Sequence, residues 1–358
     1  MAKKKLHWSL RDSIQRVIEA IPPIIQIVLG VLGAYAFAHF ALGHEIPLFA
    51  VTVTISSLGF TRDARPRRII ETAAGMVLGI ALSEIMVMGF GQGIWQIALT
   101  LLVSFLLARF ISPSAAFAIT VGIQSMLVQL LAAPPGGAFV RSIDGFIGGV
   151  TALLVTALIP RDPRGAAIKD ADKLFDVFLD SLRSLRVALQ NSDFTVADEA
   201  LSRVRRSQPL IDNWRMSLDS AIAISRISPF LRKYRDDLSG QVRLLRGMDL
   251  ATRNLRVVVR RIDFLLRDKQ PRPYLAELIE QIFIGTMSLA EALEKPEKLE
   301  AAQQQYLDVI HQLDPKRFGI ADELREASVL LLLRPLLVDL LCATGMSEDE
   351  AREELPKV

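Results

Sequence analysis

Long apolar stretches separated by short polar segments fill the first 160 residues, whereas the rest of the chain alternates apolar and charged positions at helical spacing. About 20 apolar residues are enough for a helix to cross the hydrocarbon core of a bilayer. The pattern predicts six membrane spans, at residues 23–42, 46–60, 69–89, 93–111, 115–133 and 140–159. The second span is short and carries several hydroxyl side chains, so its assignment needs further support.

The apolar half of the chain repeats itself. Three segments recur in the same order: Gln26–Leu29 as Gln96–Leu99, Phe49–Ser57 as Phe117–Ser125, and Arg68–Gly75 as Arg141–Gly148. This order indicates a duplication, with repeats at residues 23–90 and 93–160, and it supports the weak second span. Because each repeat holds three spans, an odd number, the second repeat is expected to lie inverted in the bilayer. Inverted repeats of this kind are typical of transporters.

Charge divides the chain in two. Most of the 42 Lys/Arg and 39 Asp/Glu residues lie in residues 161–358, which have the balanced charge of a soluble helical domain. The formal net charge of +3 therefore belongs to the apolar half and predicts no nucleic-acid partner. The single cysteine, Cys342, excludes an internal disulfide and suits a cytoplasmic domain.

Basic residues in the connecting segments predict the orientation. One side carries Lys3, Lys4, Lys5, Arg62, Arg65, Arg67, Arg68, Arg109, Arg161 and Arg164. The segments on the other side, 43–45, 90–92 and 134–139, contain no Lys or Arg. The positive-inside rule then places both termini in the cytoplasm of a multi-pass protein of the cell membrane. Residues 1–22 have an apolar and a charged helical face, which predicts an interfacial amphipathic helix; a simple cytosolic extension is the alternative.

Ionisable residues inside the predicted spans are few, and they repeat. Arg68 and Glu71 begin the third span, while Arg141 and Asp144 begin the sixth. Residues three apart share a helix face, so each pair can neutralise itself, with the arginine reaching the headgroups. Alternatively, the inversion places one arginine at each mouth of a common pathway, where its guanidinium would bind carboxylates. Glu84 is either a proton-coupling carboxylate or an interfacial residue.

Neutral polar side chains and glycines complete the candidate residues. The hydroxyl and amide groups at mid-depth suit either a pathway or hydrogen bonds to their own helix; they are Thr52, Thr54, Thr120, Gln124 and Ser125. Glycines at short spacing are expected to let helices approach closely; they are Gly75, Gly79, Gly148 and Gly149. No phosphate-binding loop, catalytic motif or metal-ligand cluster is visible in the sequence. We therefore expect no enzymatic activity and no cofactor.

Together, the two copies of three spans and the repeated Arg-x-x-acid-x-x-x-Gly motif resemble the fusaric acid resistance / aromatic acid exporter family, itself similar to the plant aluminium-activated malate transporters. The resemblance implies a homodimer that exports organic anions, often aromatic carboxylates. It also implies that Arg68 and Arg141 line the anion pathway. A passive anion channel remains an alternative.

Residues 161–358 predict a cytoplasmic helical bundle. Helices are expected at residues 196–228, 231–268, 274–293, 298–313 and 320–344, after a first amphipathic helix that follows Pro163. Arg334, Pro335 and Asp339 interrupt the apolar run of the last helix, which favours a buried bundle helix over a seventh span. The size of the bundle leaves a further alternative, a membrane scaffold whose bundle binds a partner protein.

Overall fold

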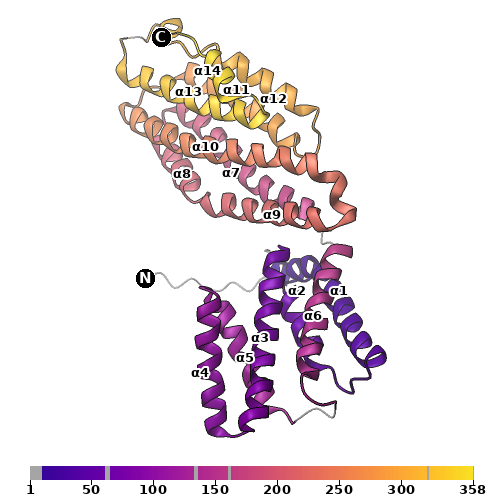
Figure 1. The fold of residues 1–358 in the computed structure, drawn as a ribbon. Coiled ribbons are helices and arrows are strands. Elements are labelled where there is room, and N and C mark those ends of the chain that lie inside the picture. Colours follow the sequence, from indigo (N-terminus) through magenta and orange to yellow (C-terminus); the bar gives the residue numbers. More distant parts are fainter. Residues whose placement is uncertain (1–9, 61–64, 133–135, 160–162, 321, 358) are drawn as a thin grey trace. The chain divides into compact units, whose positions relative to one another are not determined.

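The computed structural model describes the chain except for residues 1–9, 61–64, 133–135, 160–162, 321 and 358. Some of the basic residues that predict the membrane orientation lie outside the described residues, namely Lys3–Lys5, Arg62 and Arg161. Every regular element in the described part is a helix, so the prediction of an all-helical protein is confirmed (Figure 1). The chain divides into two compact units, residues 1–161 with 222–232 and residues 162–221 with 233–358.

Before residue 160, the described residues of the first unit form six α-helices. Helices α3 to α6 run side by side in Figure 1. The helices are α1 (Leu10–Ala36), extended by a π-helical turn (Phe37–Ala41), α2 (Leu48–Leu58), α3 (Pro66–Phe90), α4 (Ile94–Ile111), α5 (Ala115–Leu130) and α6 (Val140–Leu158). Pro66 occupies the first turn of α3, where its missing N–H costs nothing. Ser114 caps α5 by accepting a hydrogen bond from the Phe117 N–H.

Two differences from the predicted spans concern helix length. The expected interfacial helix and first span form one continuous helix, α1, which includes Pro22 and Pro23. Segments of α1, α3, α4 and α6 are long and apolar enough to cross a membrane, whereas α2 and α5, with 11 and 16 residues, are shorter than a full span. The predicted second and fifth spans were therefore too long.

The helices of the first unit contact one another in matching pairs. Helix α2 packs against α6, and in the same way α3 packs against α5. Helix α1 contacts α2 and α6, and correspondingly α4 contacts α5 and α3. Helices α3 and α6 also contact each other. Each of these pairs becomes the other when the first three helices exchange with the last three, whereas the contact of α2 with α3 has no counterpart of similar extent between α5 and α6. The third helix of one predicted repeat thus packs on the second helix of the other.

Glycines and hydroxyls lie at these close helix contacts. The Thr54 hydroxyl donates to the Gly148 carbonyl at 3.1 Å, and the Ser125 hydroxyl donates to the Gly79 carbonyl at 3.0 Å. A Cβ atom at Gly148 would lie 2.5 Å from a backbone carbonyl of α2, and one at Gly79 would lie 2.4 Å from a backbone carbonyl of α5. Gly75 faces the ring of Phe117, so the α3–α5 contact is close over about one helical turn, from Gly75 to Gly79.

Replacing Gly79 by alanine is expected to destabilise the first unit by about 1–3 kcal/mol, because the new methyl group would force α3 away from the α5 backbone. Thermal unfolding of the purified full-length protein in detergent would measure the loss. Gly89→Ala is the matched control on the same helix, since nothing lies within 4 Å of a Cβ there. Equal melting temperatures of the two variants would contradict the close contact.

The second unit is a bundle around a core of aliphatic and aromatic side chains that includes Phe175, Trp214 and Tyr306. The helices that follow residue 162 are α7 (Pro163–Asn191), α8 (Phe194–Arg205), α9 (Gln208–Ile227), α10 (Arg235–Leu265), α11 (Pro273–Glu291), α12 (Lys298–Ile310), α13 (Leu324–Thr344) and α14 (Glu348–Glu353), with short 3₁₀ segments at Pro229–Tyr234, Leu266–Asp268 and Pro315–Phe318. They belong to the second unit except for residues 222–232, which include the end of α9 and are counted with the first unit. The single helix expected at 196–228 was wrong, because the chain turns at Arg206 and Ser207 and restarts with Pro209 in the first turn of α9.

Helix α13 meets the length and hydropathy criteria for a membrane span. It nevertheless packs against α10 and α12, and most of its apolar side chains are fully buried within the second unit. The apolar composition of α13 is therefore explained by its position in the core of the second unit.

Candidate functional site

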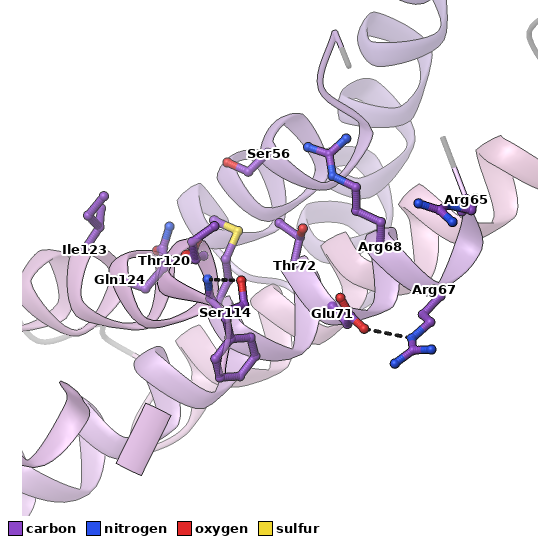
Figure 2. A pocket seen from close by; sticks show the side chains of 13 residues that line it. Ser56, Arg65, Arg67, Arg68, Glu71, Thr72, Ser114, Thr120, Ile123 and Gln124 are labelled. Carbon is purple, nitrogen blue, oxygen red and sulfur yellow. Dashed lines mark hydrogen bonds and ion pairs between the residues drawn. The ribbon is translucent and has the colours of Figure 1, made fainter. Parts of the chain in front are cut away.

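A pocket of about 660 Å³ opens in the first unit near the N-terminal ends of α3 and α5. Helix α3 and the residue before it contribute the arginines at positions 65, 67 and 68, as well as Glu71, to its lining. Helix α5 contributes Thr120 and Gln124, and the C-terminal part of α2 contributes Ser56. Figure 2 shows Arg67 and Arg68 extending in opposite directions from α3.

The pocket is electropositive. The Nε atom of Arg67 lies 2.9 Å from a carboxylate oxygen of Glu71, so Arg67 is an ion-pair partner of the acidic residue of the motif (Figure 2). Both partners are more than half exposed, and such a pair contributes little stability. Three arginines face a single carboxylate, and the N-terminal ends of two helices add partial positive charge. This arrangement suits an anion.

Neutral polar and apolar groups line the rest of the pocket. The Thr120 hydroxyl donates to the Ala116 carbonyl of its own helix at 2.8 Å. The side chain of Gln124 is 4% exposed, and its Oε1 atom has no hydrogen-bond partner among the described residues. Phe117 and Met76 supply apolar surface beside these groups. The pocket can therefore hold a carboxylate with an apolar body and offer it one further hydrogen-bonding side chain.

Three of the predicted neutral pathway residues lie outside this pocket. Thr52 contacts a carbonyl of its own helix at 3.4 Å. Thr54 and Ser125 each bond to a carbonyl of their own helix and to one of a neighbouring helix, and both are buried. The structure places these two hydroxyls in helix–helix contacts.

The second arginine of the repeat lies in a different setting. The guanidinium of Arg141 donates to the carbonyls of Val128 at 3.0 Å, of Leu131 at 3.1 Å and of Ala132, all at the C-terminal end of α5. Its positive charge therefore stabilises carbonyls that the helix leaves unpaired. It also lies 5.9 Å above the ring centre of Phe49. Arg141 is only 7% exposed, in contrast to the pocket arginines.

Two buried carboxylates accompany Arg141. Glu84 of α3 accepts hydrogen bonds from the backbone N–H groups of Arg141 at 3.3 Å and Ser142 at 3.2 Å, and from the Ser142 hydroxyl at 2.5 Å. It thus caps the N-terminus of α6 from another helix. Asp144 has its Oδ1 atom 2.6 Å from Nδ1 of His44. Sequence reasoning missed both contacts because their partners lie far apart in the chain.

The two arginines lie at opposite ends of the α3–α6 pair. Glu84, late in α3, bonds to the first turn of α6, so these helices run antiparallel. At 1.5 Å per residue, Glu84 lies roughly 24 Å along α3 from Arg68, which approaches the thickness of the hydrocarbon core. Arg68 lines an open pocket at one end, and Arg141 is buried at the other.

The family of the chain follows from two comparisons. A family model described as fusaric acid resistance protein-like matches residues 32–155. An uncharacterized protein of Corynebacterium glutamicum is 30% identical over 373 aligned positions, which cover 98% of this chain and 94% of the relative. The chain belongs to the fusaric acid resistance protein-like family. That family consists of membrane transporters, and its matched segment contains both arginines and the whole pocket lining.

Proposed function

We propose that the protein exports organic anions, with aromatic carboxylates as the preferred class, from the cytoplasm across the cell membrane. The observation that carries the proposal is the pocket in which three arginines and two helix N-termini surround a space large enough for a small organic acid. Arg68, Thr120 and Gln124 would hold the substrate, while Phe117 and Met76 would contact its ring. The pathway would continue past Arg141 and Asp144 to the external side.

The paired helix contacts support an inverted repeat and, with it, alternating access. In transporters with inverted repeats, the two halves exchange conformations when the binding site turns from one side to the other. The open Arg68 end and the buried Arg141 end fit one of the two states of such a cycle. Because the connecting segments near Arg68 are rich in basic residues, we assign the open end and both termini to the cytoplasm.

The assembly is proposed to be a homodimer in the bilayer, with residues 161–358 as a cytoplasmic bundle. Helix α4 presents exposed apolar side chains that need lipid or a second copy as a partner; they include Leu102, Phe105, Leu106 and Phe110. No metal or cofactor enters the proposal.

Flux into proteoliposomes tests the function directly. A radiolabelled aromatic carboxylate such as benzoate should cross vesicles that contain the purified protein faster than protein-free vesicles, and a neutral aromatic amide of equal size should not. Bilayer recording separates the two mechanisms: unitary currents would favour a passive channel, whereas flux without them favours a carrier. Absence of carboxylate flux in both assays would contradict the proposal.

The open and closed ends predict different thiol accessibility along a single helix. In a Cys342→Ala background, Thr120→Cys lies in the pocket, whereas Val128→Cys lies two turns further along α5 at a position that is 1% exposed. A membrane-impermeant maleimide is expected to label the Thr120 variant at least about tenfold faster, because only accessible thiolates react. The labelling should occur from the cytoplasmic side of oriented vesicles. Equal rates, or labelling of the Thr120 variant only from outside, would contradict the assignment.

A further inference from the structure

Four ionisable side chains gather at the end of the first unit where Arg141 is buried. Asp144, Glu84 and Arg141 are 2%, 6% and 7% exposed, and the His44 side chain is 14% exposed. They come from three different parts of the chain, since His44 lies in the segment between the π-helical turn and α2. The fusaric acid resistance protein-like family match assigns none of them a role.

The hydrogen bonds of the cluster divide it into two parts. Glu84 and Arg141 bond to the backbone, with the carboxylate capping α6 and the guanidinium bonding the last carbonyls of α5. Asp144 and His44 instead contact each other, at 2.6 Å between Oδ1 and Nδ1. The backbone carbonyl of His44 lies 2.8 Å from Nδ1 of His39, which fixes the segment that carries the imidazole.

The charges of the cluster do not balance when the imidazole is neutral. Two carboxylates then face one guanidinium, and an excess negative charge remains in a buried site, which is costly. A single proton on the His44–Asp144 pair makes the cluster neutral. An imidazolium beside a carboxylate is also the stronger hydrogen-bonded form.

Among the other titratable groups near the pair, only the imidazole of His39 can carry a positive charge, and its Nδ1 atom contacts the backbone carbonyl of His44 rather than a carboxylate. Tyr35 of α1 stacks on the ring of His39, with 5.6 Å between ring centres, and helix α2 carries no titratable side chain. Glu45, next to His44, is exposed and negative. The charged side chains that α3 and α6 place near the His44–Asp144 pair are Glu84 and Arg141, whose charges are already part of the balance given above.

We propose that His44 and Asp144 form a proton-binding site at the end of the transporter opposite the anion pocket. Proton uptake there neutralises the cluster in which Glu84 and Arg141 tie α3, α5 and α6 together, and it thereby favours closure of that end. Loss of the proton leaves the excess carboxylate charge and favours opening. The protonation state of this pair would thus bias the equilibrium between the two states of the proposed transport cycle.

Histidine NMR tests the site without any transport substrate. In full-length protein labelled with ¹⁵N-histidine in lipid nanodiscs, His44→Gln identifies the His44 signals. In spectra recorded from about pH 5 to 8, we expect these signals to report proton uptake by the pair, and Asp144→Asn to lower the proton affinity about tenfold or more. His311, which pairs with Glu354 in the second unit, is the internal reference, and its signals should be the same in both proteins at every pH.

Constant His44 signals over this range, or an unchanged proton affinity in Asp144→Asn with an unchanged His311 signal, would overturn the proposal. A second experiment measures how accessible the Arg141 end is, through the thiol at position 128 of the Cys342→Ala, Val128→Cys variant. Because the thiolate fraction itself falls with pH, each labelling rate is divided by that of a free small-molecule thiol at the same pH. This normalised rate should fall as the pH falls, and the His44→Gln substitution should remove that remaining dependence. Because neither readout uses an anion, failure of the proton site is distinguishable from failure of the proposed anion transport.

Discussion

Replacing Arg68 by glutamine is expected to lower carboxylate flux in proteoliposomes by about 10–100-fold, since a guanidinium–carboxylate contact in a partly enclosed site contributes roughly 1.5–3 kcal/mol. Glutamine keeps hydrogen-bonding capacity and most of the side-chain length but removes the charge. The fall should be largest at low substrate concentration, where binding limits the rate, and it should be accompanied by weaker inhibition by competing carboxylates.

Two matched variants make this prediction specific to the pocket. Arg68→Lys retains the charge and loses the planar fork, so it should recover only part of the flux. Arg109→Gln removes a charge from the end of α4, where the side chain bonds to the Pro113 carbonyl at 2.6 Å and does not line the pocket. It should leave flux within about twofold of the original protein, as expected for an exposed group. Equal losses in Arg68→Gln and Arg109→Gln would contradict a role for the pocket.

The second large effect is expected in the helical bundle, at Arg272. This residue is 5% exposed, and its guanidinium bonds Asp268 at 2.5 Å and Glu326 at 3.0 Å. The Tyr274 hydroxyl donates to the same Glu326 carboxylate, and burial together with this carboxylate raises the tyrosine pKa. Arg272→Met should destabilise the second unit by about 2–4 kcal/mol, because the two carboxylates keep their charge and lose their partner. Chemical unfolding of the full-length protein in a Trp8→Phe, Trp95→Phe background, followed through the fluorescence of the remaining Trp214, would measure the change.

The pH dependence of this effect has a defined sign. The hydrogen bond from Arg272 holds the pKa of Asp268 below its usual value. The interaction therefore stabilises the fold above the ordinary aspartate pKa and is lost as the pH falls through the lowered value. The difference between Arg272→Met and the original protein should narrow below about pH 4. Arg183→Met is the control: its partner Asp180 is about half exposed, so a change above roughly 1 kcal/mol there would point to a general effect of losing arginines.

Local sequence pattern predicts much of this molecule. Hydropathy and the repeated motif led to an all-helical membrane protein and to its family, and the two glycine-rich stretches fall at close helix contacts. The arginine at position 68 and the polar residues Thr120 and Gln124 do lie in one pocket. These features depend on periodicity and charge, which a single sequence displays.

The remaining features depend on tertiary contacts that spacing does not reveal. The sequence suggested Arg68 as the ion-pair partner of Glu71, and the structure shows Arg67, which lies four residues before Glu71, in contact with that carboxylate. Arg141 turns to the carbonyls of α5, and Asp144 meets a histidine 100 positions away. The lengths of α2 and α5 were overestimated because apolar residues continue past the ends of both helices into the turns.

The cross-packing of the helices also constrains how the chain is made. Helix α2 is too short to span a bilayer by itself, and one of its main partners, α6, begins about 90 residues later, which corresponds to roughly 5–20 s of synthesis. During that interval its polar groups, among them the Thr54 hydroxyl, lack the α6 backbone that accepts them in the finished fold. Insertion of the first three helices is therefore provisional until the last one emerges, and the membrane unit is completed as a whole rather than helix by helix.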